Sequence, residues 1–197
     1  MKLTGLLLAA AALSCAAPAA ATIFIVEAGA NSSTSGVALS TLALSAGQVI
    51  NVSASTSDLW SAGSLPRLSD ANGLVINRIA AASDDSGLRD GVTQITAIFP
   101  LWTQDGFTAP FASLVGRVGS EYKVLGTSFT GSFASAGTLQ LFFWDQNNSD
   151  NTGNIAANIT VREGPQLAVP EPGTWAMMLL GISAVGLATR RRRMATA

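Results

Sequence analysis

The sequence predicts an all-β protein: a jelly roll or β-sandwich in residues 22–168, between an N-terminal signal peptide and a C-terminal single transmembrane helix. Three observations predict this architecture. Short runs that alternate apolar and polar residues recur through the middle of the chain, turn residues separate these runs, and a helical period is sustained only at the two ends. The sandwich is therefore expected to be one domain of ordinary size.

The first 21 residues have the pattern of a secretory signal peptide. A lysine precedes an apolar run from Leu3 to Leu13, and small residues follow, ending in Ala19 and Ala21. A positive end, a short apolar core and an A-x-A exit predict cleavage by signal peptidase after Ala21. Two alternatives are a membrane anchor, for which the run is short against a hydrocarbon layer of ~30 Å, and lipoprotein processing at Cys15.

The central segment contains three runs with the two-residue period of a half-buried strand. Their apolar faces are Ile50, Val52 and Ala54 in 49–55; Leu139, Leu141 and Phe143 in 138–144; and Ile155, Ala157, Ile159 and Val161. The turn residues expected between the strands are Ala46-Gly47, Asn72-Gly73, Asp90-Gly91, Gly131 and Gly137. The polar stretch Asn31–Gly36 is expected to be a short linker.

The C-terminus combines three features in a fixed order. A Pro-Glu-Pro motif is followed by an apolar run from Trp175 to Thr189, about 22 Å long as a helix, and then by four arginines. Arginines favour the cytoplasmic side of a membrane, which places the bulk of the protein outside. The residues concerned are Pro170, Glu171, Pro172, Trp175, Ala176, Arg190, Arg191, Arg192 and Arg193.

This tail resembles the PEP-CTERM sorting signal, in its PEPxxWA variety, over residues 169–197. The resemblance implies a Gram-negative bacterium with an exopolysaccharide-rich envelope, and an exosortase-type membrane protease that cleaves near the PEP motif. It also implies that the exported chain is held in the inner membrane before processing and then reaches the cell surface or extracellular matrix. The alternative is an ordinary tail-anchoring helix that follows a chance Pro-Glu-Pro.

The second half of the central domain carries another resemblance. The blocks Ala109–Gly119, Ala136–Leu141 and Trp144–Gly153 occur in that order, each followed by a strand or a turn. They resemble the galactose-binding-like jelly roll of PA-IL-type galactophilic lectins. The resemblance implies noncatalytic carbohydrate binding. Those lectins use a histidine in the region that corresponds to residues 65–106, whereas this chain contains none.

A calcium site is predicted on the loop between the last two strands. Asp145, Asn147, Asp150 and Asn151 place four oxygen-bearing side chains within seven residues. Hard oxygen ligands on a short loop suit Ca²⁺, and backbone carbonyls can complete the coordination. The alternative is a polar hairpin whose Asn and Asp side chains bond to their own backbone. The lectin resemblance favours calcium.

The composition excludes several classes of function. The chain has no histidine and one cysteine, so a Ser-His-Asp triad, a Cys/His zinc site and an internal disulfide cannot be built. Residues 22–168 contain eleven acidic and six basic residues, a formal charge of −5, which argues against nucleic acid as a partner. Because no catalytic constellation can be assembled, we do not expect an enzyme. In particular, Asp145 and Asp150 share one loop instead of facing each other across a glycosidase cleft.

Two function classes remain open. The first is a calcium-dependent envelope protein that binds carbohydrate, with the organism's own exopolysaccharide as the expected ligand. The second is a structural matrix or surface protein that binds no sugar. Trp60, Trp102 and Trp144 are candidates to stack on sugar rings, with core packing as the alternative for at least two of them. The acidic turn Asp84-Asp85 with Asp90 is read as a solvated turn, with a second cation site as the alternative.

Overall fold

A computed structural model of the chain describes residues 20–63, 67–75, 77–92, 99–162, 173 and 177–183. The chain divides into two compact units, Met1–Arg162 and Glu163–Ala197. In the second unit, residues 177–183 are helical. No helix in the described part of the chain is both long enough and apolar enough to cross a membrane. The predicted span Trp175–Thr189 falls outside the described residues apart from 177–183, and the predicted signal peptide falls outside them apart from its last two residues.

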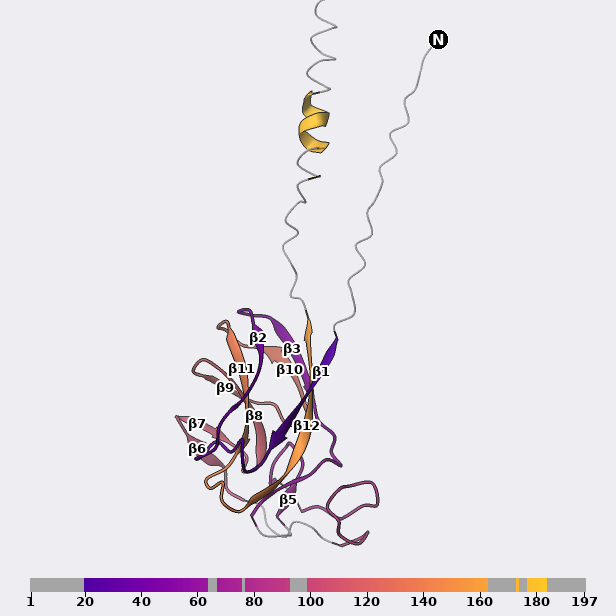
Figure 1. Ribbon diagram of the computed structural model, residues 1–197, viewed down its shortest axis with the longest axis vertical. Helices are drawn as coiled ribbons and strands as arrows, with labels where there is room; N and C mark the ends of the chain where they lie inside the picture. The colour runs from indigo at the N-terminus through magenta and orange to yellow at the C-terminus, as the bar shows by residue number, and fades with distance from the viewer. Residues whose placement is uncertain are drawn as a thin grey trace, which may run out of the picture. The chain divides into compact units, whose positions relative to one another are not determined.

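The first unit is a sandwich of two antiparallel sheets (Figure 1). One sheet has the strand order β10-β3-β12-β4-β5, with β1 also paired to β12; its strands are β1 (Ala21–Glu27), β3 (Val49–Ser53), β4 (Trp60–Ala62), β5 (Leu68–Ser69), β10 (Ser128–Ser132) and β12 (Asn151–Arg162). The other has the order β2-β11-β8-β9; its strands are β2 (Leu39–Leu44), β8 (Ser113–Val118), β9 (Glu121–Val124) and β11 (Gly137–Trp144). This architecture confirms the predicted all-β sandwich.

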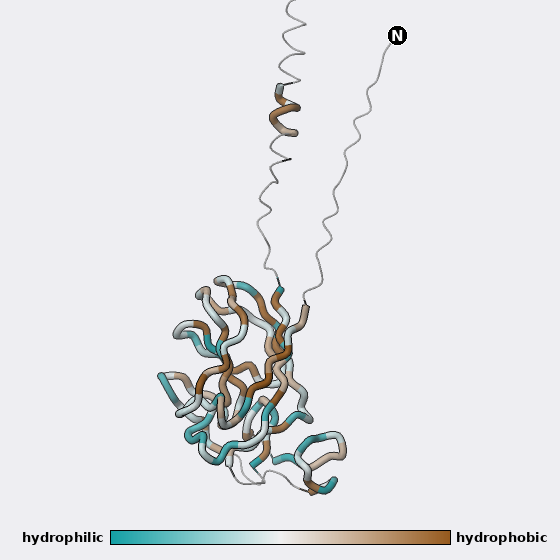
Figure 2. Tube along the Cα trace, viewed as in Figure 1, coloured by the Kyte–Doolittle hydropathy of each residue, from teal (hydrophilic) through white to brown (hydrophobic). Residues whose placement is uncertain are grey.

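The core lies between the two sheets and is built from the apolar faces predicted by the alternating runs. In β3 and in most of β12 every second side chain is buried, because successive side chains of a strand point to opposite faces of its sheet. In β11 the side chains on the core face are likewise buried. Figure 2 shows hydrophobic segments concentrated in the strands of the body and hydrophilic ones in the loops. The buried residues from the predicted faces are Ile50, Val52, Ala54, Leu139, Leu141, Phe143, Ile155, Ala157 and Ile159, and Val161 packs against them partly buried.

A short hairpin adds a second apolar cluster outside the sandwich core. Strands β6 (Trp102–Gln104) and β7 (Phe107–Ala109) pair with each other. Ala109 is buried with Val115, Phe142 and Trp144, and the rings of Phe107 and Trp144 meet edge to face with centroids 5.5 Å apart. The hairpin therefore covers the outer face of the end of β11, which explains why Phe142 and Trp144 are buried on the side away from the main core.

Two of the predicted turn residues lie in strands. Gly137 is the first residue of β11 and pairs with Leu44 of β2. Gly131 lies inside β10, where it pairs with Ile50 of β3. A Cβ atom at this position would lie 2.7 Å from the ring of Phe129, so the glycine makes room for that ring within the strand. In contrast, Gly47, Gly73 and Gly91 have positive φ values of 72°, 87° and 83°, as expected for turn residues.

Candidate functional site

The four predicted calcium ligands lie on the connection from β11 to β12. Asp145 follows the last residue of β11, and Asn151 is the first residue of β12. Both of these side chains are buried, with 3% and 9% of their surfaces exposed. Asn147 and Asp150 are exposed at the loop surface. The loop therefore carries one carboxylate inside the protein and a second at its surface.

A segment distant in sequence holds this loop in place. The hydroxyl groups of Ser33 and Thr34 both donate to the backbone carbonyl of Asp145, at 2.9 and 2.8 Å. The Asp145 N–H in turn donates to the Ser33 hydroxyl at 3.0 Å, and the Asn148 amide donates to the Ser35 carbonyl at 3.1 Å. The segment Asn31–Gly36 was predicted to be a linker, but the structure shows that it fixes the 145–150 loop through these hydrogen bonds. Its serines and threonine gave no sign of this in the sequence, since their partners lie more than a hundred residues away.

Burial dominates the electrostatics of Asp145. Its burial raises the pKa of the carboxyl group above the ordinary value for aspartate, and the charge of Asp150 acts in the same direction. Hydrogen bonds from the Asn151 side chain and from the backbone of Gln146 and Asn147 oppose this shift in pKa. The Gln146 N–H lies 2.7 Å from Asp145 Oδ1. A positive charge at this point would therefore favour the ionised carboxylate that the protein interior disfavours.

The side-chain oxygen of Asn151 is a hydrogen-bond acceptor to which no group in the described part of the chain donates. Its Nδ2 donates to the Ala28 carbonyl at 3.4 Å, but its buried Oδ1 makes no hydrogen bond. Buried polar atoms without a partner in the protein are rare, and an ordered water or a bound ion is one way in which such an atom is satisfied. The Asn147 Nδ2 donates to Asp150 Oδ1 at 3.0 Å, and its Oδ1 accepts from the N–H and hydroxyl of Ser149 at 3.1 and 3.0 Å. The Asn147 amide oxygen is thus already occupied.

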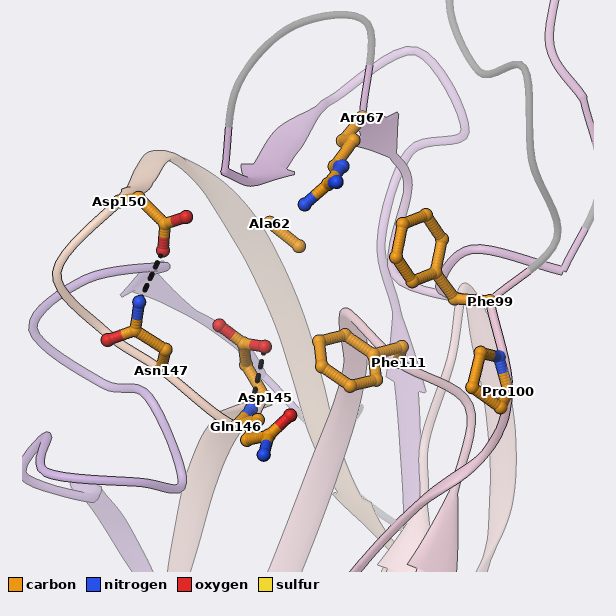
Figure 3. Close-up of a pocket in the computed structure, with 9 residues that line it drawn as sticks. All are labelled: Ala62, Arg67, Phe99, Pro100, Phe111, Asp145, Gln146, Asn147 and Asp150. Atoms are coloured by element: carbon orange, nitrogen blue, oxygen red, sulfur yellow. Dashed lines mark hydrogen bonds between the residues drawn. The ribbon is translucent and has the colours of Figure 1, made fainter.

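A pocket of about 360 Å³ opens beside the loop (Figure 3). Its polar side is formed by the 145–150 loop, and its other side is apolar, with the rings of Phe99 and Phe111 at a centroid distance of 5.9 Å. Figure 3 shows both rings facing the space between them and the two carboxylates. The lining residues are Ala62, Arg67, Phe99, Pro100, Phe111, Asp145, Gln146, Asn147 and Asp150.

The tryptophans predicted as sugar platforms lie outside this pocket, and two of them are core residues. Trp60 is fully buried, its indole N–H donates to the Ala112 carbonyl at 2.9 Å, and its ring packs edge to face on Phe143. Trp144 is 1% exposed, and its N–H donates to the Trp102 carbonyl at 2.9 Å. Neither can present a ring to a sugar. Trp102 is partly buried in the hairpin cluster. The aromatic surface of the pocket comes instead from two phenylalanines that the sequence analysis did not single out.

The acidic turn at Asp84 has a structural role. The Asp84 carboxylate accepts hydrogen bonds from the Ala81 N–H at 2.9 Å and from the Ser86 hydroxyl at 2.6 Å. Burial raises the pKa of Asp85, and the neighbouring Asp58 adds to this. Within the described ranges, no group of three or more His, Cys, Asp or Glu side chains could hold a metal ion. A site in the 145–151 loop would therefore depend on two carboxylates together with amide and carbonyl oxygens.

Comparison with known proteins identifies the tail. Residues 168–193 match the family described as the PEP-CTERM protein-sorting motif. This match covers Pro170, Glu171, Pro172, Trp175, Ala176 and Arg190 to Arg193, all of which lie outside the described residues. No curated protein matches the chain.

One solved structure similar to this chain is the EclA N-terminal domain, described as a PllA-like lectin. The sequence identity is 25% and the TM-score is 0.43; the match covers 71% of this chain and 95% of that chain. A TM-score of this size assigns no role to any residue, so the site stands on its own geometry.

Proposed function

We propose that this chain is an exported surface protein whose sandwich domain binds carbohydrate, without catalysis, in the pocket beside the 145–150 loop. The observation that carries the proposal is the pairing of two phenylalanine rings with a rim of carboxylate and amide side chains around one cavity. Sugar rings have apolar C–H faces that pack on aromatic rings, and hydroxyl groups that bond to carboxylates and amides. The volume of about 360 Å³ is in the usual range for small-molecule sites.

We further propose that the loop holds Ca²⁺. The donor set fits a hard cation: the buried carboxylate of Asp145, the carboxylate of Asp150 and the unpartnered Oδ1 of Asn151. Because the Asn147 amide oxygen already accepts two hydrogen bonds, its backbone carbonyl is the better candidate for a fourth ligand. When bound, the ion would neutralise the two carboxylates and offer coordination positions to sugar hydroxyl groups.

The destination of the protein follows from its tail. A PEP-CTERM motif implies export, a membrane-anchored intermediate and a final surface location. We propose that an exosortase-type protease cuts near Pro170–Pro172, and that signal peptidase removes residues 1–21. The host would be a Gram-negative bacterium that makes an exopolysaccharide. That polysaccharide is the ligand we propose, since it would be the carbohydrate nearest to the sorted protein.

A glycan array tests the proposal. The purified full chain, in a nonionic detergent, is applied to hexoses and to the native surface polysaccharide, with CaCl₂ or with EDTA. We expect binding that is lost in EDTA. The variant Phe111→Ala, which removes one ring of the pocket, should bind less, whereas Phe129→Ala, outside the pocket, should bind as the unchanged protein does. Absence of binding to every sugar in CaCl₂ would contradict carbohydrate binding and leave a structural matrix protein.

A further inference from the structure

Among the described residues that line the pocket, Arg67 carries the positive charge. Its side chain lies across the cavity from the 145–150 loop, and its guanidinium carbon is 4.9 Å from the centroid of the Phe99 ring. In Figure 3 the nitrogen atoms of Arg67 point toward the space between Phe99 and Asp150. A Cβ at Gly63 would lie 2.9 Å from Asp150 Oδ2 and 3.4 Å from an Arg67 nitrogen. Because Gly63 has no side chain, the Asp150 carboxylate and the Arg67 guanidinium can both lie close to its Cα in the wall of the pocket.

Among the described residues, the contact of the exposed Arg67 guanidinium is the face of the Phe99 ring, and its N–H groups make no hydrogen bond or ion pair with another described side chain. Two other arginines differ. Arg78 forms an ion pair with Asp70 at 2.6 Å, and Arg117 donates to Gln140 at 2.6 and 3.0 Å. Arginine has five N–H donors in a planar fork that matches a carboxylate. Within the described lining of the pocket, this fork is bonded to no acceptor.

The charges around the pocket favour an anionic ligand once the loop is neutralised. Asp145 and Asp150 carry a formal −2, which the proposed Ca²⁺ would cancel, so Arg67 would leave the pocket with a formal +1. We propose that the pocket selects an acidic sugar, a hexuronic acid residue whose carboxylate is bound by the Arg67 guanidinium. The sugar ring packs on the two phenylalanines, and its hydroxyl groups meet the loop. This inference rests on the proposed carbohydrate function and adds the class of sugar.

The test compares each acidic sugar with its neutral parent. Calorimetric titrations use the full chain in nonionic detergent with CaCl₂, and methyl glycosides of glucuronic, galacturonic and mannuronic acid beside those of the parent hexoses. We expect at least one acid to bind roughly two- to fivefold more tightly than its parent, the range for an ion pair with an exposed side chain. The ratio should fall when salt is raised, because Arg67 is exposed and its charge is screened.

Two variants of Arg67 test whether its guanidinium causes the preference for the acidic sugar over its neutral parent. In Arg67→Gln the ratio of acid to parent affinity should fall close to one. Arg67→Lys should retain part of it, since lysine keeps the charge but loses the planar fork. Arg89→Gln, a matched change at an exposed arginine outside the pocket, should keep the full ratio. Circular dichroism verifies that each variant is folded.

The outcomes separate this inference from the proposed function. Equal affinity for acid and parent, or an unchanged ratio in Arg67→Gln, would overturn the acidic-sugar proposal while calcium-dependent binding of neutral sugars would still stand. Binding of the acid that needs Arg67 but persists in EDTA would support recognition of the carboxylate by Arg67, and would contradict both the calcium site and the need for Ca²⁺ to neutralise the loop. Failure of both sugars to bind in CaCl₂ would overturn the inference together with carbohydrate binding.

Discussion

The variant Asp145→Asn separates a calcium loop from a polar hairpin. Asp145 is 3% exposed, and its burial raises the pKa of the carboxyl group. A group with a raised pKa in the folded state contributes stability that is full below the ordinary pKa of aspartate and is lost as pH rises through the folded pKa. In EDTA at pH 7 the ionised carboxylate therefore destabilises the fold. We expect Asp145→Asn to melt at an equal or higher temperature than the unchanged protein under these conditions.

Calcium should reverse this order. Ligand binding to the folded state alone stabilises by about 2.7 kcal/mol at a concentration a hundredfold above Kd. For a domain of this size each kcal/mol shifts Tm by roughly 2–4 °C, so the unchanged protein should gain about 5–10 °C. Most of this gain should be absent in Asp145→Asn. It should also shrink as pH falls toward the raised pKa of Asp145, since protons then compete with the ion.

Differential scanning fluorimetry in EDTA, CaCl₂ and MgCl₂ measures these shifts. Mg²⁺ should give a smaller rise, because it requires tighter octahedral geometry and loses water reluctantly. The control is Asp84→Asn, whose carboxylate bonds within its own turn and should leave the calcium-dependent rise intact. The same rise in Asp145→Asn, or no calorimetric signal for Ca²⁺ at millimolar concentration, would refute the site.

Three further outcomes are expected. Mass spectrometry of the surface fraction should find a C-terminus near residue 170; mature protein that retains Met177 would contradict processing at the PEP motif. The Leu139 side chain in β11 is fully buried, so Leu139→Ala should lower the free energy of unfolding in urea by about 2–5 kcal/mol. A loss under ~1 kcal/mol would argue against that packing. By the same assay Gly73→Ala should cost more stability than Gly47→Ala. The φ angle is positive at both positions, but only at Gly73 would the new Cβ collide with a backbone carbonyl oxygen, that of Phe111.

The sandwich could be predicted because its strands are half buried. A strand with one face in the core has an alternating sequence, as in β3 and β12, and this pattern needs no knowledge of which strand lies next to it. Trp144 shows the limit. It is on the face of β11 opposite Leu139, and only the β6–β7 hairpin, a separate element, determines that this face is also buried. From the sequence alone, Trp144 could be either buried or exposed, because its burial depends on a hairpin whose position the sequence pattern does not reveal.

The site was predicted only where its residues are adjacent in sequence. Asp145 to Asn151 form one loop, so their oxygen atoms could be grouped from the sequence. Ser33 and Thr34, which fix that loop, come from a segment 111 or 112 residues earlier. Phe99 and Arg67, which form the opposite wall, come from connections that have no repeating pattern. Only the folded chain brings these parts together.

A crystal structure grown with CaCl₂ and a bound saccharide would show directly whether the ion and the sugar share this pocket. We expect an anomalous peak at about 2.3–2.6 Å from carboxylate oxygens of Asp145 and Asp150 and from Asn151 Oδ1. We also expect density for a sugar ring between this ion and the rings of Phe99 and Phe111. No peak at the loop, or a saccharide bound at any other surface of the sandwich, would contradict the proposed site.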